Sequence, residues 1–114
     1  MPSRTKGELG EALAAQYLEA QGWRMIARNY RCPWGEIDLI CEKKPFLVFA
    51  EVKARTGVRY GLPREAVTLK KQERIKMTAS LWLSEHPTDA QPRFDVLEVY
   101  LPSGRINHLE NAFW

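Results

Sequence analysis

The stretch GEIDLICEKKPFLVFAEVKAR, residues 35–55, decides the fold, because it holds two apolar runs on either side of a Lys-Pro pair. Two such runs around a turn predict a β-hairpin. Each run also carries a carboxylate where a buried strand rarely has one: Asp38 in the first, and Glu51 in the second with Lys53 two residues on. Side chains alternate along a strand, so Glu51 and Lys53 share a face.

The register of this hairpin decides whether the charges meet. A turn centred between Lys44 and Pro45 sets Asp38 directly opposite Glu51. Proline prefers the first central turn position, and that register would set Asp38 opposite Lys53 with Glu51 diagonal. The register between these two would move Asp38 to the other face and separate the charges.

Two neighbouring carboxylates repel each other and are costly to ionise together in a dry site. A hard cation resolves the repulsion, since Mg²⁺ takes one or two carboxylates and keeps other positions for water and phosphate. Lys53 beside such an ion could orient a water or stabilise negative charge. The alternative is a structural ion triad in which Lys53 neutralises Asp38 and Glu51. Placement in apolar strands favours function, because a buried ion pair adds little stability.

Two helices supply further candidates. Thr5 and Glu8 fit a capping box for a helix that ends at Gly22, with an apolar arc centred on Leu13, Tyr17 and Ala20. Glu11, at the edge of that arc, is the candidate third carboxylate; a solvated helix acid is the alternative. In the second helix Lys71 falls in an inward stripe with Val67, Ile75, Ala79 and Trp82, where it could reach phosphate near Glu51 or extend outward to solvent. Gln72 beside it could bind water or backbone.

The loop between the second apolar run and this helix is basic. Cations interleaved with an aromatic ring suit a phosphate backbone and an unstacked base, although an ordinary surface loop has the same composition. Its candidate nucleic-acid contacts are Arg55, Arg59, Tyr60 and Arg64. Trp34, beside Gly35, could also stack on a base, but we expect it to be buried. We expect Asp95 to pair with Arg93 or cap a strand, and His86 and His108 to carry no chemistry.

Composition fits one α/β domain over residues 1–114. The chain has a net charge of +3, which permits a nucleic-acid partner without requiring one. The predicted order is helix, three strands, helix, two strands, with the second helix beginning between Pro63 and Thr68 and ending near Glu85. We find no signal-peptide pattern, no apolar run of membrane-spanning length and no metal-type cysteine spacing, so we expect a cytoplasmic protein without a membrane partner.

An acid on the first helix, then an Asp, then E-x-K on the next strand resembles the PD-(D/E)xK nuclease superfamily, in particular its Holliday-junction-resolvase-like branch. GELGEALAAQYLEAQGW, GEIDLI, FAEVKAR and RFDVLEV together resemble the YraN family of small bacterial proteins. The resemblance implies a restriction-endonuclease-like mixed sheet flanked by helices, with Asp38, Glu51 and Lys53 as the catalytic core, Glu11 as the helix acid and Lys71 as a family lysine. Ile37 departs from the superfamily pattern, which expects proline there. Resolvase relatives act as dimers on branched DNA, which makes a homodimer an expectation.

We therefore expect a Mg²⁺- or Mn²⁺-dependent endonuclease acting on branched or single-stranded DNA, with RNA as another substrate that the sequence allows. Asp38, Glu51 and Glu11 would hold the metal, and Lys53 would position the nucleophile. The alternatives are a catalytically weak or inactive nucleic-acid-binding module with the nuclease fold, and an interaction protein that assembles with DNA-processing partners.

Overall fold

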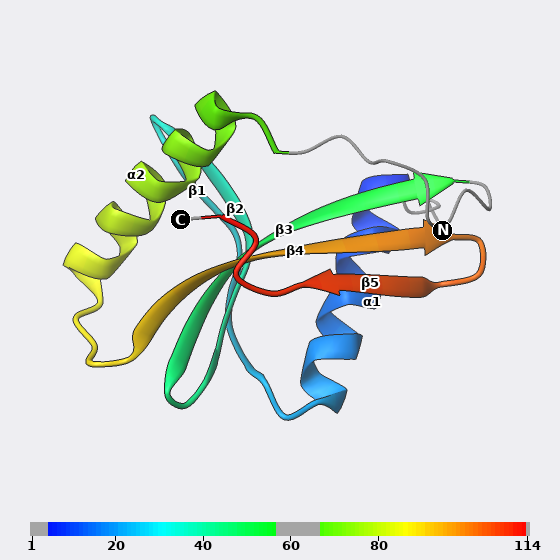
Figure 1. Ribbon diagram of the computed structural model, residues 1–114, viewed down its shortest axis with the longest axis horizontal. Helices are drawn as coiled ribbons and strands as arrows, with labels where there is room; N and C mark the ends of the chain where they lie inside the picture. The colour runs from blue at the N-terminus through cyan, green and yellow to red at the C-terminus, as the bar shows by residue number, and fades with distance from the viewer. Residues whose placement is uncertain (1–4, 57–66, 114) are drawn as a thin grey trace.

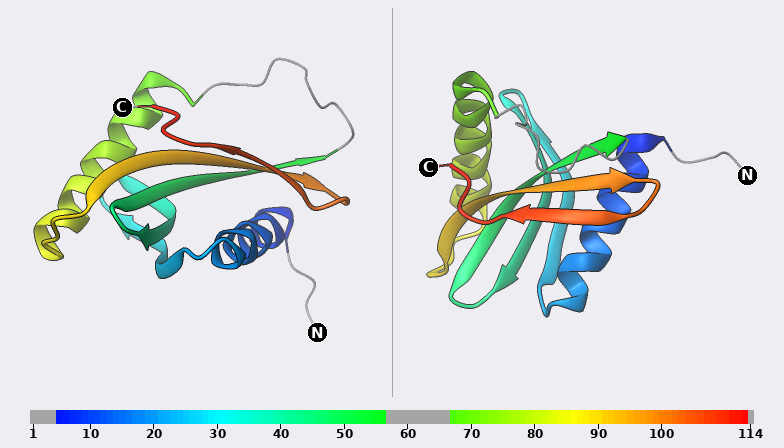
Figure 2. Two further views of the ribbon diagram at one scale, coloured as in Figure 1. Left: turned by 60° about the horizontal axis from the view of Figure 1, so that its bottom comes forward. Right: turned by 45° about the vertical axis from the view of Figure 1, so that its right-hand side comes forward.

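The computed structural model describes residues 5–56 and 67–113, which build one mixed β-sheet with a helix on each face. The elements are α1 (Lys6–Ala20), β1 (Arg24–Cys32), β2 (Gly35–Lys43), β3 (Phe46–Thr56), α2 (Leu69–Glu85), β4 (Gln91–Leu101) and β5 (Arg105–Leu109). This order confirms the prediction. Figure 1 shows the strands in one sheet, and the two views of Figure 2 show α1 and α2 on opposite sides of it.

The sheet follows the chain order β1-β2-β3-β4-β5, and only the β3–β4 pair among these strands is parallel. That pair needs a crossover connection, and α2 lies within it. The β2–β3 hairpin turns at Lys44 and Pro45 and pairs Leu39 with Ala50. Continued by one residue, this register sets Asp38 opposite Glu51, which is the first of the arrangements that the sequence allowed. In it, Pro45 takes the second central turn position rather than the first.

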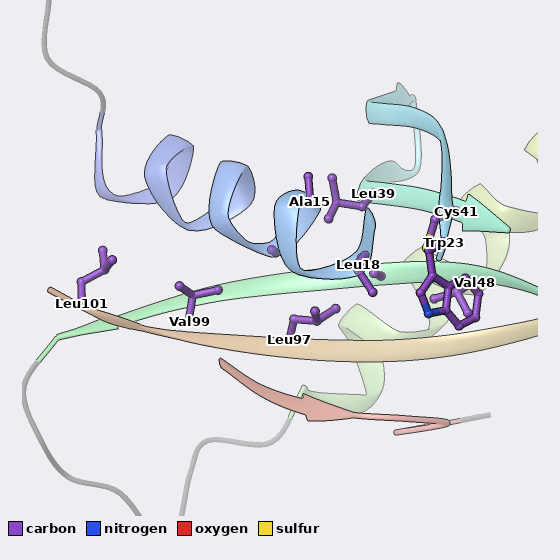
Figure 3. Packing of buried hydrophobic residues seen from close by; sticks show 11 residues of the cluster. Ala15, Leu18, Trp23, Leu39, Cys41, Val48, Leu97, Val99 and Leu101 are labelled. Atoms are coloured by element: carbon purple, nitrogen blue, oxygen red, sulfur yellow. The ribbon is translucent and has the colours of Figure 1, made fainter. Parts of the chain in front are cut away.

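Alternation along β3 divides the core between the two faces. Val48 and Ala50 join the cluster under α1, whereas Leu47 and Phe49 join the cluster under α2. Figure 3 shows the α1 side, where Leu18 and Ala15 point toward side chains of β2, β3 and β4. Glu51 and Lys53 continue the Leu47 and Phe49 side of β3, so they belong to the face that α2 covers.

The predicted arc of α1 is correct in part, because Leu13 and Tyr17 pack against the core, but its centre is displaced. The fully buried residues are Gly10, Ala14, Ala15 and Leu18, whereas Ala20 is exposed. Small side chains set this orientation, because a Cβ added at Gly10 would lie only 3.0 Å from Cβ of Ala54. Thr5 caps the helix as predicted, since its hydroxyl oxygen accepts a hydrogen bond from the backbone N–H of Glu8 and the hydroxyl donates to Oε1 of Glu8.

The second helix begins at Leu69, and Thr68 caps it by accepting from the backbone N–H of Lys71. Its buried residues include the predicted Ile75, Ala79 and Trp82. Within the described ranges, no helix is long and apolar enough to cross a membrane.

Candidate functional site

The candidate site lies where β2 and β3 move apart. Their backbone pairing is recorded as far as Leu39 and Ala50. One residue beyond, Oδ2 of Asp38 accepts a hydrogen bond of 2.8 Å from the backbone N–H of Val52. A side-chain oxygen of β2 therefore accepts a hydrogen bond from a backbone N–H of β3 just beyond the last recorded β2–β3 backbone pair. This bond holds the Asp38 carboxylate against β3.

Asp38 and Glu51 are each only 8% exposed, and their proximity changes the ionisation of Asp38. Burial, followed by the negative charge of Glu51, raises the pKa of Asp38 to about 7, although the hydrogen bond from Val52 opposes the shift. Glu11 and Glu36 add smaller contributions in the same direction. Burial and the neighbouring acid thus both disfavour the charged form of Asp38.

Lys71, from the first turn of α2, contacts Glu51. Its Nζ lies 2.5 Å from Oε1 of Glu51. The alternative drawn from the sequence gave the neutralising role to Lys53, which is half-buried on the same strand as Glu51 and in register with Glu98 of β4. The inward position predicted for Lys71 brings it to this carboxylate.

A hollow of about 440 Å³ opens beside these groups, and we call it the carboxylate hollow. Acids from the hairpin face cations from α2 across it. Its lining consists of Gly35, Glu36, Asp38, Glu51, Thr68, Lys70, Lys71, Arg74 and Ile75. Lys70 and Arg74 are exposed to solvent and line the hollow, because the first turns of α2 pass over it. Carboxylates that bind a hard cation and amines that bind phosphate thus share one concave surface.

Glu11 lies on the part of α1 that faces the sheet, in line with Ala14, Ala15 and Leu18. It is half-buried and close enough to raise the pKa of Asp38, but it is not among the residues that line the carboxylate hollow. Across residues 5–56 and 67–113, no three Asp, Glu, His or Cys side chains are grouped so that they could hold a metal ion. Asp38 and Glu51 are thus the central acidic pair, with Glu11 nearby.

The predicted nucleic-acid contacts are divided. Nη2 of Arg55 lies 3.5 Å from Oε2 of the buried Glu98, and Nε2 of Gln72 donates to the carbonyl of Val67 at 2.8 Å. Both side chains therefore contact protein groups here. Arg59, Tyr60 and Arg64 lie outside the described residues.

Trp34 departs from its expected burial. It sits in the β1–β2 turn and is 47% exposed, beside Gly35 of the carboxylate hollow. The sequence signal for this position was the turn context Cys-Pro-Trp-Gly, which projects a side chain from the end of a hairpin rather than into the core.

A second buried carboxylate, Asp95, lies on the α1 side of β4 and is 0% exposed. Arg93 binds both of its oxygens at 2.9 Å, Nε2 of His108 donates to Oδ2 at 2.7 Å, and the backbone N–H of Asn111 donates to Oδ1 at 3.0 Å. The hydroxyl of Tyr17 lies 3.2 Å from Nδ1 of His108. Burial alone would raise the pKa of Asp95, but the bonds from His108, Arg93 and Asn111 outweigh it and hold the pKa below its ordinary value. The predicted Arg93 pairing is present.

Comparison with known proteins places the chain among small bacterial proteins of similar length. Residues 10–99 match the family model described as "Uncharacterised protein family UPF0102". The UPF0102 protein of Symbiobacterium thermophilum is 51% identical, covering 97% of this chain and 98% of its own. The UPF0102 protein of Caldanaerobacter subterraneus is 45% identical, covering 96% and 95%. The UPF0102 protein of Clostridioides difficile is 41% identical, covering 99% and 100%.

Among solved structures, Pyrococcus furiosus SfsA in complex with Ca²⁺ matches with a TM-score of 0.36 and 19% identity. The match covers 92% of this chain and 62% of that one. A likeness of this size carries no argument about chemistry, so the functional inference depends on the residues themselves.

Proposed function

The chain belongs to the uncharacterised protein family UPF0102, which confirms its resemblance to the YraN family, and from that premise we propose that it is a metal-dependent endonuclease acting on DNA. The observation that carries the proposal is the carboxylate hollow, in which the repelling pair Asp38 and Glu51 faces three cationic side chains of α2. A phosphodiester needs both kinds of group: a cation held by acids at the reacting phosphorus, and positive charge along the backbone.

The donor set fits Mg²⁺ or Mn²⁺. Asp38 and Glu51 offer hard carboxylate oxygens side by side, and a cation between them would relieve the repulsion that raises the pKa of Asp38. Glu11, already close enough to act on Asp38, would support the ion through water. When bound, such an ion polarises a phosphoryl oxygen and acidifies a water molecule.

The chain's own cations have separate tasks in this proposal. Lys53 shares the face of Glu51 and would orient the attacking water or stabilise negative charge on the phosphate. Lys71 would leave Glu51 when a metal ion takes that carboxylate, and would then bind the substrate phosphate. Lys70 and Arg74 would hold neighbouring phosphates, and Arg55, Arg59, Tyr60, Arg64 and Gln72 remain candidate contacts to the strand. We expect branched or single-stranded DNA as substrate, and a homodimer as the acting form.

The test is cleavage of a labelled four-way junction, a single strand and a duplex by purified protein in Mn²⁺ or Mg²⁺, with EDTA as the blank. Glu51→Gln and Asp38→Asn should each abolish cleavage while keeping the far-ultraviolet circular dichroism of the wild type. Glu42→Gln is the matched control, because Glu42 lies on β2 but pairs with Arg24 at the opposite end of the hairpin. Equal cleavage by all variants would assign the activity to a contaminant and refute the proposal.

A second candidate function is a nucleic-acid-binding module without cleavage. The contact between Lys71 and Glu51 favours it, because a neutralised Glu51 is a weaker metal ligand. This candidate predicts salt-dependent DNA binding that EDTA leaves unchanged, together with no cleavage of any of the three substrates.

A further inference from the structure

A second hollow, of about 460 Å³, lies beside the carboxylate hollow, and we call it the Trp34 hollow. Its lining residues are Trp34, Lys76, Met77, Ser80 and Leu81, and most of its surface is apolar. Trp34 and Met77 are each 47% exposed. Two large apolar side chains exposed together around one hollow mark a surface that can bind a partner.

The two hollows share a wall. Gly35 lines the first and Trp34 the second, while on α2 Arg74 lines the first and Met77 the second. The β1–β2 turn packs closely on the helix at this wall, since a Cβ added at Gly35 would lie 3.6 Å from Cβ of Arg74. From Lys71 to Met77 the helix axis advances by about 9 Å, a distance that a short piece of a nucleic-acid strand can bridge.

Positive charge accompanies both hollows. Lys70, Lys71 and Arg74 line the first, and Lys76 lines the second. An apolar hollow with an indole at its wall and cations along its edge is complementary to a ligand that carries planar rings on an anionic chain. A second copy of this chain would bring the same cations toward each other, which opposes its docking here.

We propose that the Trp34 hollow holds an unpaired nucleobase of the DNA strand whose phosphate lies in the carboxylate hollow. The base stacks on the indole of Trp34 with Met77 and Leu81 around it, and Lys76 binds the adjoining phosphate. Stacking of this kind tolerates any base, because every base has a π face. The inference rests on the proposed function and sharpens it, since it selects substrates with unpaired nucleotides over a closed duplex.

The experiment separates the base from the backbone. Fluorescence anisotropy at fixed salt and in EDTA measures the dissociation constants of the full chain for a labelled oligothymidylate and for an abasic oligonucleotide of the same length. We expect the wild type to bind the oligothymidylate about tenfold more tightly than the abasic strand, the size of one stacked base. Trp34→Ala should remove that preference and leave the abasic affinity unchanged, and Trp34→Phe should keep part of it.

Leu69→Ala is the matched control, because Leu69 is an apolar α2 residue, 76% exposed, that is not among the lining residues of either hollow. It should keep the full preference. As a second readout, the oligothymidylate should quench the fluorescence that the wild type has and Trp34→Phe lacks.

An unchanged preference in Trp34→Ala, with Mn²⁺-dependent cleavage intact, would overturn the base site and leave the proposed function standing. A change from dimer to monomer on Trp34→Ala in sedimentation would instead assign the hollow to a second copy and overturn the inference. No binding of either strand by the wild type would refute the proposed function and this inference together.

Discussion

Asp38 and Asp95 are both buried aspartates in neighbouring parts of one sheet, yet they are opposites in chemistry. Asp95 is bound by Arg93, His108 and a backbone N–H, and its pKa is lowered. Asp38 accepts a hydrogen bond from Val52, lies close to the acid Glu51, and has its pKa raised to about 7. Burial is common to both, so burial alone does not mark a functional carboxylate. What marks Asp38 is that the fold buries it beside another acid and next to an open hollow.

The largest expected effect is on stability. Asp95→Asn removes the charge that Arg93 and His108 pair with and should lower the free energy of unfolding by about 3–5 kcal/mol, because the largely buried Arg93 loses its bidentate carboxylate. Asp38→Asn makes the same chemical change on the other face and keeps an acceptor for the N–H of Val52. It should not destabilise the protein at neutral pH, and should raise the free energy of unfolding by a few kcal/mol at most, since it removes a repulsion. Urea unfolding at neutral pH measures both, and equal losses would contradict the distinction.

The pH dependence of stability should have opposite signs for the two groups. The raised pKa of Asp38 means that the folded protein keeps a proton which the unfolded chain loses near pH 4, so wild-type stability should fall between about pH 4 and pH 7 relative to Asp38→Asn, by a few kcal/mol at most. The lowered pKa of Asp95 gives stability that is present above about pH 4 and lost as pH falls through its folded pKa. Urea unfolding in EDTA at several pH values measures these free energies. If the difference in stability between the wild type and Asp38→Asn did not change with pH, the raised pKa of Asp38 would be refuted.

Removing the lysine that contacts Glu51 should increase the affinity of the Asp38–Glu51 pair for a metal ion. Lys71→Met frees Glu51 from its ion pair, so we expect Mn²⁺ to bind about fivefold more tightly in calorimetry, which corresponds to about 1 kcal/mol for a partly exposed pair. DNA affinity should fall in the same variant, because the phosphate loses a lysine. Lys76→Met, on the same helix but outside the carboxylate hollow, is the control for metal affinity. Weaker Mn²⁺ binding in Lys71→Met would show that Lys71 supports the metal site.

The smallest effect concerns the outer member of the Asp95 network. Tyr17→Phe removes the hydroxyl that lies 3.2 Å from His108 and should cost about 1 kcal/mol of stability, the usual net value of one hydrogen bond. DNA cleavage should be unaffected, because Tyr17 is on the α1 side of the sheet. Thermal unfolding and the junction assay measure the two outcomes. A loss of cleavage without a loss of stability would contradict the prediction, because it would show that the Asp95 network on the α1 side affects the carboxylate hollow on the α2 side.

Local patterns were enough to predict the element order and the hairpin that carries Asp38 and Glu51. The alternation of side chains along the strands, the Lys44-Pro45 turn and the capping residues each depend on a few neighbouring positions, and all three are present in the structure. The centre of the α1 arc could not be placed this way, because a hydrophobic pattern does not reveal where a small residue lets the helix approach the sheet closely. The close approach of Gly10 to Ala54 orients that helix.

The partners of the charges depend on tertiary placement. Lys71 is twenty residues from Glu51 and reaches it only because α2 crosses back over the sheet between the parallel strands β3 and β4. His108 looked isolated in the sequence, since its contact with Asp95 requires β5 to lie beside β4. Trp34 was expected to be buried as large aromatic residues often are, but its place in the turn between β1 and β2 leaves it exposed.

The hydrogen bond from Val52 to Asp38 offers a spectroscopic reporter that needs no substitution. The amide proton of Val52 points at a side-chain oxygen of the candidate site, whereas residues 46–50 of β3 pair with the backbone of β2 in a regular ladder. In a magnetic resonance titration with Mg²⁺, this single backbone signal should move first and farthest. One atom would thereby register ion occupancy and proton release at Asp38 in the unmodified molecule.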